Sequence, residues 1–415
     1  MNTRSIRSVA ALTIAGMALV LTAGAADTAT GPATTSSAPA VAPKALSKNV
    51  DSGLAWLAKH QLESGAWGQG EESKDMGGGT ALKDTASVGD TCMALLGLMR
   101  AGNTPENGAY SKNVQAGIKY ICDQVDKSDT DGLAINNTTG TRIQSKLGQY
   151  IDTFMACTML ADAQERTTNK ELLKTITASL EKVVKKIEKN QTAKGTWGRE
   201  GWAQALEQQM AVKGLNMAAR NGNKVDEKVL QKAVEESQGR YDAGKKSFSR
   251  DGTAGVDLYG VSSSLGGQTE NYRTDQMKKS ELKEKLATAK PAEKEAIQKD
   301  LGRIADNEAK YHATSQAVAA KLDDAQFLSG FGSNGGEEFL SYMTIGESLV
   351  GRAGDEWTKW DKKMTENMNR IQNQDGSWSG QHCITGRTFC TSAALLVLMV
   401  DRTPAPIAAK IGKRQ

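Results

Sequence analysis

The sequence has little histidine, proline or aromatic content, and these shortages narrow the classes of protein it can represent. Its 415 residues include 3 His, 7 Pro, 6 Phe, 7 Trp and 8 Tyr. Three histidines are too few for the multi-histidine centres that many metalloproteins use. Lys and Arg number 52 against 48 Asp and Glu, and a net charge of +4 argues against a dedicated nucleic-acid binder. A charged fraction of 24% and a hydrophobic fraction of 39% fit neither a disordered polyelectrolyte nor a membrane bundle.

The sequence also lacks a long hydrophobic run, and the apolar run near its N-terminus is short. Arg4 and Arg7 precede an apolar stretch over residues 9–21, which falls short of the roughly 20 residues that a transmembrane helix requires. Small residues over 23–25 then fit a cleavage site. We therefore expect residues 1–25 to be a signal peptide, no transmembrane segment after its cleavage, and a secreted or periplasmic protein. A retained membrane anchor is the alternative.

The rest of the chain divides by composition into three parts. Residues 26–45 consist mainly of Ala, Thr, Ser and Pro, a composition that does not fold on its own, and we interpret them as a flexible spacer. Residues 46–403 carry the apolar periodicity of a folded domain. Residues 404–415 form a basic tail that is too short to imply a polyanionic partner.

All five cysteines lie beyond the expected signal peptide, so export would place them in an oxidising compartment. Cys383 and Cys390 are close enough in the sequence to form a disulfide, and the odd count leaves at least one thiol unpaired. Small buried thiols on helices are the alternative for the other cysteines. These are Cys92, Cys122 and Cys157.

An internal repeat is the strongest feature of the sequence. Three times, a glutamine is followed by a glycine four residues later and by a tryptophan six residues later. We expect each of these corners to end an amphipathic helix, with the glycine at positive φ and the tryptophan packed back over the helix end. The copies are Gln61, Gly65 and Trp67; Gln191, Gly195 and Trp197; and Gln372, Gly376 and Trp378.

Weaker copies extend the pattern to six pairs of helices. The first helices, each with a charged face, are expected to begin near Asn49, Tyr110, Lys170, Val225, Ala292 and Asp355. The second helices, apolar nearly all round, are expected to begin near Ser87, Lys146, Gly201, Thr253, Glu337 and Gly386. A helix that is apolar on all sides is a buried one, so the second helices are predicted to form an inner layer. Six such pairs can close into a double ring, an all-α (α/α)6 toroid.

The corners, together with Trp56 in the first helix, resemble the QW repeats of the squalene cyclase and prenyltransferase superfamily. The resemblance implies the terpenoid cyclase-like α/α toroid. It does not extend to the catalytic motifs, because the Asp-x-Asp-Asp acid cluster of the cyclases is missing. The zinc-dependent prenyltransferases imply a metal site at Asp90 and Cys92, but the histidine that should complete it is displaced to His382. We therefore expect no metal and no cofactor, with Asp90 capping its helix and Cys92 packed.

Residues 272–310 depart from the repeat. Lysines and glutamates alternate on both sides of Pro291, and such alternation favours a solvated helix. The sequence predicts a charged helical hairpin that is inserted into the toroid and projects from it. An inert insertion and an arm that docks a protein partner are both consistent with this pattern.

Polar residues gather where the second helices begin, which in a closed ring would place them at one mouth. Helix capping explains the acids without a function, because the macrodipole stabilises negative charge at helix N-termini. The alternative is a catalytic mouth in which His382 or Arg387 faces Glu338. Asp152 and Tyr259 are the other candidate catalytic residues there. The acids at the helix starts are Asp90, Asp152, Glu200, Asp257, Glu337 and Glu338.

These features favour an exported toroid that binds or scaffolds without cyclase chemistry, with an unknown peptide, lipid or glycan as ligand. A polysaccharide-degrading, lyase-type enzyme at the mouth is the alternative, with Arg387 as its leading catalytic residue. A terpenoid cyclase or prenyltransferase is the third hypothesis. The low aromatic content argues against a cyclase, because carbocations are stabilised by aromatic faces. The missing cyclase acid motif and zinc triad leave enzymatic activity undecided from the sequence.

Overall fold

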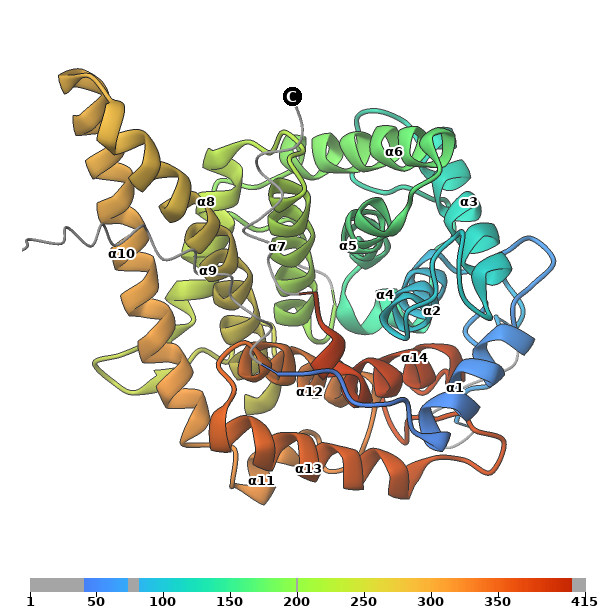
Figure 1. Cartoon of the computed structure of the whole chain (residues 1–415). Helices are drawn as coiled ribbons and strands as arrows, with labels where there is room; N and C mark the ends of the chain where they lie inside the picture. Colours follow the sequence, from blue (N-terminus) through green and yellow to red (C-terminus); the bar gives the residue numbers. More distant parts are fainter. Residues whose placement is uncertain (1–40, 74–81, 199–200, 405–415) are drawn as a thin grey trace, which may run out of the picture. The chain divides into compact units, whose positions relative to one another are not determined.

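Helices make up nearly all of the regular structure in the computed structural model (Figure 1). It describes residues 41–73, 82–198 and 201–404. All of these belong to one compact unit, Pro39–Gln415. The predicted signal peptide, most of the predicted spacer and residues 405–415 of the basic tail lie outside the described residues. The predicted all-α class is confirmed, since the strands found among the described residues are the short antiparallel pair β1 (Tyr241–Asp242) and β2 (Ser247–Phe248).

Two kinds of helix alternate along the chain. The amphipathic first helices are α1 (Lys48–Lys59), α3 (Ser111–Lys127), α6 (Lys170–Lys189), α8 (Glu227–Gly239), α10 (Pro291–Ala319) and α13 (Gly354–Ile371). The second helices are α2 (Val88–Arg100), α5 (Ile151–Arg166), α7 (Gln204–Arg220), α9 (Asp257–Thr288), α12 (Gly336–Val350) and α14 (Arg387–Leu398). Shorter helices are α4 (Arg142–Leu147), α11 (Ala325–Leu328) and η2 (Val400–Arg402). Every residue of α2 and α12 is buried, as the apolar composition of the second helices predicted.

The second helices contact one another in chain order. α2 packs on α5, α5 on α7, α7 on α9, α9 on α12 and α12 on α14, and α14 packs in turn on α2. The amphipathic helices lie outside them in Figure 1, with α1 against α14, α6 against α5 and α13 against α12. The hydrophobic core therefore sits between the two kinds of helix.

Side-chain caps fix where several helices begin. Ser87 accepts a hydrogen bond from the backbone N–H of Asp90 at the start of α2, and Ser47 caps α1 in the same way. Asn169 accepts from the backbone N–H of Leu172 at the start of α6. Each cap satisfies a donor that has no partner within the first helical turn. The helix starts therefore follow from residues close in the sequence.

The three Gln–Gly–Trp corners fold alike, and as predicted. Their glycines have φ angles of 85°, 79° and 90°, in the left-handed region. Each tryptophan packs back on the preceding helix, and its indole N–H donates to a backbone carbonyl at 2.6–2.8 Å. The donor and acceptor pairs are Trp67 with Leu57, Trp197 with Ile187, and Trp378 with Met368.

The glutamine of each corner reaches beyond its own loop to the next amphipathic helix. Its side-chain amide donates to a backbone carbonyl there, at 2.8–3.0 Å. The pairs are Gln61 with Asn113 in α3, Gln191 with Val229 in α8, and Gln372 with Asn49 in α1. The third corner thus joins the end of α13 to α1, which lies near the other end of the described chain.

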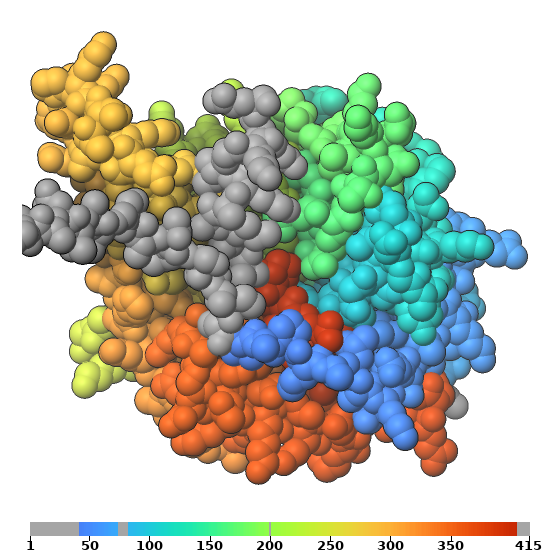
Figure 2. All heavy atoms as spheres, in the orientation of Figure 1, coloured from blue at the N-terminus to red at the C-terminus, as the bar shows by residue number. Residues whose placement is uncertain are grey.

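The residues predicted to form a charged hairpin, 272–310, lie on α9 and α10. The second of these helices begins with Pro291 in its first turn, where a missing N–H costs nothing. Lys279 of α9 pairs with Glu308 of α10 at 2.6 Å. In Figure 2 the tip of this pair, coloured gold, extends beyond the neighbouring helices.

Candidate functional site

A cavity of about 570 Å³ lies among the second helices. Its lining residues recur at spacings of three and four, so one face of each helix borders it. They include Met93, Leu96 and Arg100 on α2; Met210, Lys213, Met217 and Arg220 on α7; and Met343 and Glu347 on α12. The volume falls within the roughly 300–1,000 Å³ of small-molecule sites. We therefore take this cavity as the candidate site.

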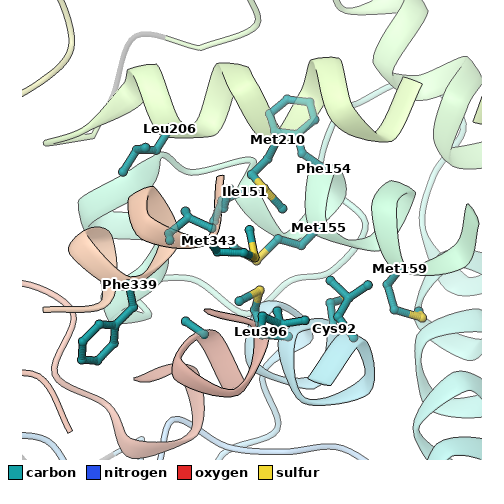
Figure 3. Packing of buried hydrophobic residues seen from close by; sticks show 14 of the residues in the cluster. Cys92, Ile151, Phe154, Met155, Met159, Leu206, Met210, Phe339, Met343 and Leu396 are labelled. Atoms are coloured by element: carbon teal, nitrogen blue, oxygen red, sulfur yellow. The ribbon is translucent and has the colours of Figure 1, made fainter. Parts of the chain in front are cut away.

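One layer of the cavity is apolar and rich in methionine. Met210, Met343 and Leu396 contribute to it, and Figure 3 shows their side chains gathered between the helices. No Phe, Tyr or Trp of the described residues lines the cavity. Methionine side chains are flexible and polarisable, so this layer can adapt to the shape of a ligand.

A charged layer lies about one helical turn further along the same helices. Lys213 follows Met210 by three residues, Arg100 follows Leu96 by four, and Glu347 follows Met343 by four. One turn of helix rises about 5.4 Å, so the charged groups are stacked directly beyond the apolar ones. The cavity is therefore amphipathic along its depth.

Glu347 is the centre of the first ion-pair group in the charged layer. Its carboxylate lies 2.9 Å from the guanidinium of Arg100 and 2.5 Å from the ammonium of Lys213, and all three side chains are buried. Burial alone raises the pKa of Glu347, but Lys213 and Arg100 outweigh it and hold that pKa at about 2. Glu347 is therefore ionised at neutral pH.

Glu270 forms a second group with Arg220, at 2.6 Å, and Arg273, at 2.7 Å. Burial again acts to raise the pKa of Glu270, and the two arginines lower it below its usual value. Arg273 also donates to the backbone carbonyl of Glu347 at 2.6 Å, which joins the two groups into one network. The network sets four cations against two ionised carboxylates, a surplus of two positive charges.

The other charged residues of the lining are one cation and three acids, which offset this surplus in number but lie outside the network. Asp162 pairs with Arg166 at 2.9 Å, and Lys278 pairs with Glu227. The remaining acids of the lining are Glu165, which is exposed, and Glu281, which is half-buried. Solvent screens these two acids more than it screens the buried members of the network, which are Arg100, Lys213, Glu270 and Glu347.

The residues of the network were not among those predicted from the sequence. They are Arg100, Lys213, Arg220, Glu270, Arg273 and Glu347. A weak signal is present, because Arg100 ends a helix that is otherwise largely apolar and Arg220 stands in the last turn of α7. Cations in the last turn are also favoured by the helix macrodipole, so this signal alone does not distinguish a site from a cap.

At the opposite ends of the second helices, the structure brings together three of the predicted catalytic residues. Glu338 accepts a hydrogen bond from the hydroxyl of Tyr259 at 2.5 Å, and its other oxygen lies 3.4 Å from Nε2 of His382. Burial raises the pKa of Glu338, and His382 and the hydrogen bond from Tyr259 oppose that shift. All three side chains are buried, so this group is packed into the core.

Other predicted acids at the helix starts are buried as well. Asp90, Asp152 and Glu337 each have one carboxylate oxygen without a hydrogen-bond partner among the described residues. Burial raises the pKa of Asp90 to about 7 and that of Glu337 to about 8. The second oxygen of Asp152 accepts from Asn136 and Gln144. Asp90 and Glu337 therefore hold their protons at mildly acidic pH.

Two further predicted acids differ from this pattern. Glu200 lies outside the described residues, and Asp257 pairs with Arg250 at 2.7 Å near the surface. Glu207, which the sequence did not single out, is buried at the start of α7 and accepts from the backbone N–H of Tyr150 at 3.0 Å. Burial raises the pKa of Glu207 to about 8.

Arg387, the leading candidate for a degradative enzyme, has partners other than Glu338. Its guanidinium lies 3.0 Å from Asp375 and 3.7 Å from Glu71, and it sits over the ring of Trp56. Of the two cations expected to face Glu338, it is His382 that does so.

The cysteines and the candidate metal ligands have ordinary packing roles. Cys383 and Cys390 are free thiols, so the disulfide considered for them is not formed, and the Cys390 thiol donates to the carbonyl of Ile384. Burial raises the pKa of Cys92 well above its usual value, which disfavours the thiolate that a metal would need. Within the described ranges, no group of three or more His, Cys, Asp and Glu side chains is arranged to hold a metal ion.

Comparison with known proteins adds no family assignment. No protein-family model matches the chain, and no curated protein matches its sequence. None of the described helices is both long and apolar enough to cross a membrane.

Proposed function

We propose that this protein is an exported α/α toroid, similar in architecture to the squalene cyclases and prenyltransferases, that binds a small molecule without cyclising it. The observation that carries the proposal is the cavity of about 570 Å³ among the second helices. It combines an apolar layer with a few buried polar groups, which is how proteins hold and orient organic ligands. The proposed export, to the periplasm or the medium, rests on residues 1–25 of the sequence.

Contacts between the helices support the toroid. From α2 to α14 the second helices follow one another in chain order, and α14 returns to α2. Gln372 donates to the backbone of Asn49, so the last amphipathic helix is hydrogen-bonded to the first. In a toroid the cavity would lie on the ring axis, towards the C-terminal ends of the second helices.

The chemistry of the cavity favours binding over cyclisation. Cyclisation of a terpenoid needs a proton donor beside the substrate and aromatic faces that stabilise carbocations. The carboxyls of Glu270 and Glu347 have lowered pKa values because of their cationic neighbours. An ionised carboxylate has no proton to donate, and the described lining contains no aromatic ring.

The polysaccharide-degrading alternative has less support. It requires a cation and a base that can both reach a sugar. Arg387 is paired with Asp375 and Glu71, whereas Glu338 is wholly buried beneath Tyr259 and His382. A scaffolding role for the tip of the hairpin over 272–310 is compatible with ligand binding, because the hairpin residues of α9 that line the cavity end at Glu281, before the tip.

Native mass spectrometry of the protein purified without detergent tests the proposal. We expect a bound small molecule that is released when the protein is denatured. Met343→Trp, which fills the apolar layer, should abolish its retention, whereas Glu366→Trp on the exposed face of α13 should not. Circular dichroism checks that both variants are folded. A wild-type protein that carries no ligand, and takes up none from a cell-envelope extract, would refute the proposal.

A further inference from the structure

The charges of the network do not cancel, although Arg220 and Arg273 are only partly buried. The sign of the surplus identifies the ligand class. Its cations are Arg100, Lys213, Arg220 and Arg273, and its carboxylates are Glu270 and Glu347. An uncompensated buried charge is costly, so an opposite charge is stabilised beside it. We infer that the cavity binds an amphiphile with an anionic head group, a carboxylate or a phosphate. This inference rests on the proposed function as a binding protein.

Lys213 is the cation most available to such a head group. An ammonium has three N–H donors, and among the described residues only Glu347 accepts from this one. Arg100, in contrast, is engaged by Glu347 through one terminal nitrogen and by Thr403 through the other. Because Lys213 lines the cavity and is otherwise buried, its remaining donors must be satisfied by whatever occupies the cavity.

The arginines of the second group are held in place before any ligand arrives. Arg220 donates to the carboxylate and the backbone carbonyl of Glu270 and to the hydroxyl of Thr274. Arg273 donates to Glu270 and to the backbone carbonyl of Glu347. A pre-organised set of cations binds an anion without the cost of ordering side chains. The two guanidiniums therefore supply a fixed positive field around the position of the head group.

The spacing of the two layers fits a head group followed directly by a hydrocarbon chain. Lys213 and Met210 are separated by about one helical turn, which rises about 5.4 Å. A head group bound at Lys213 therefore places the adjoining methylenes against Met210, Met343 and Leu396, the side chains that face one another in Figure 3. A cationic amphiphile would be repelled by the same network. A neutral amphiphile would leave the positive charge of the network uncompensated.

A series of ligands with one chain and different heads tests the inference on the wild-type protein. Delipidated protein is titrated with decanoate, decyl phosphate, decanol and decylamine, and binding is followed by calorimetry. We expect both anions to bind about tenfold or more tightly than decanol, and decylamine to bind most weakly. The ratio between decanoate and decyl phosphate distinguishes a carboxylate site from a phosphate site.

A substitution at Lys213 tests whether the network causes the preference for anionic head groups. Lys213→Met preserves the length of the side chain and should weaken both anions about tenfold or more while leaving decanol unchanged. Lys186→Met is the matched control, because Lys186 is also buried but pairs with Asp129 away from the cavity. That control should bind all four ligands as the wild type does.

The possible outcomes separate the inference from the function on which it rests. Decanol binding as tightly as decanoate, or decylamine binding best, would overturn the anionic head group and leave the binding function standing. Equal losses for decanoate and decanol in Lys213→Met would also count against the inference, because they indicate a general loss of packing. Failure of all four ligands, in a protein that also retains nothing from an envelope extract, would refute the binding function itself.

Discussion

The buried acids at the starts of the second helices should make the protein less stable as the pH rises from 5 to 8. Glu337 is wholly buried, and burial raises its pKa from 4.5 to about 8. Between these two values the folded protein keeps a proton that the unfolded chain releases. The stabilisation is therefore complete below about pH 4.5 and is lost as the pH rises through about 8.

The magnitude follows from the number of protons retained. One retained proton lowers the free energy of unfolding by ~1.4 kcal/mol for each unit of pH in this window. From pH 5 to pH 7, Glu337 alone should therefore remove ~3 kcal/mol. Glu207, whose pKa is also raised to about 8, acts in the same direction. Glu347 acts in the opposite direction, but its pKa of about 2 confines its effect to pH values below about 4.5.

Urea unfolding of Glu337→Gln at pH 5 and pH 7 measures this effect. The glutamine keeps an oxygen that can accept from the backbone N–H of Ile384, and it does not ionise. We expect the loss of unfolding free energy between the two pH values to be ~3 kcal/mol smaller in this variant than in the wild type. Glu366→Gln, at an exposed position, should keep the wild-type pH dependence. Equal pH slopes for the wild type and Glu337→Gln would refute the argument.

Two further predictions concern the corners and the charged network. Gly376→Ala would place a methyl group 2.7 Å from a carbonyl oxygen of α1 at a φ of 90°, and should lower the free energy of unfolding by ~1–3 kcal/mol. Gly351→Ala is the control in thermal melting, since its Cβ would have open space, and equal melting temperatures for the two variants would contradict the role of the third corner. Glu347→Ala leaves two buried cations without their shared anion and should cost ~3–5 kcal/mol in urea unfolding. A loss no greater than that of Glu366→Ala would show that the network contributes nothing to stability.

The helix pairs and the corners could be predicted because their signals are local. Ser87 lies three residues from the N–H that it caps, and Trp67 lies ten residues from the carbonyl that it reaches. Gly65 adopts the positive φ that the turn requires. In each of these interactions both partners lie within a short segment of the chain. The residue pattern of that segment is therefore enough to predict the interaction.

The partners of the candidate residues could not be predicted, because packing between distant segments decides them. His382 and Arg387 are close in the sequence, and both were candidates to face Glu338. The chain turns between them with a φ of 53° at Cys383, and α14 begins at Arg387. His382 is thereby directed to Glu338 and Arg387 to Asp375.

The charged network escaped prediction for a related reason, since its six residues come from four helices and are adjacent only after those helices have packed. Their positions also explain which cation depends on a ligand. Arg100 and Arg220 stand in the last turns of α2 and α7, where the macrodipole stabilises each cation by roughly 0.3–1 kcal/mol. Lys213 lies well before the last turn of α7, and the dipole effect has faded at that distance. Its charge is therefore compensated by Glu347 and by the occupant of the cavity. Replacing Lys213 should therefore reduce the preference for an anion more than replacing Arg100 or Arg220 does.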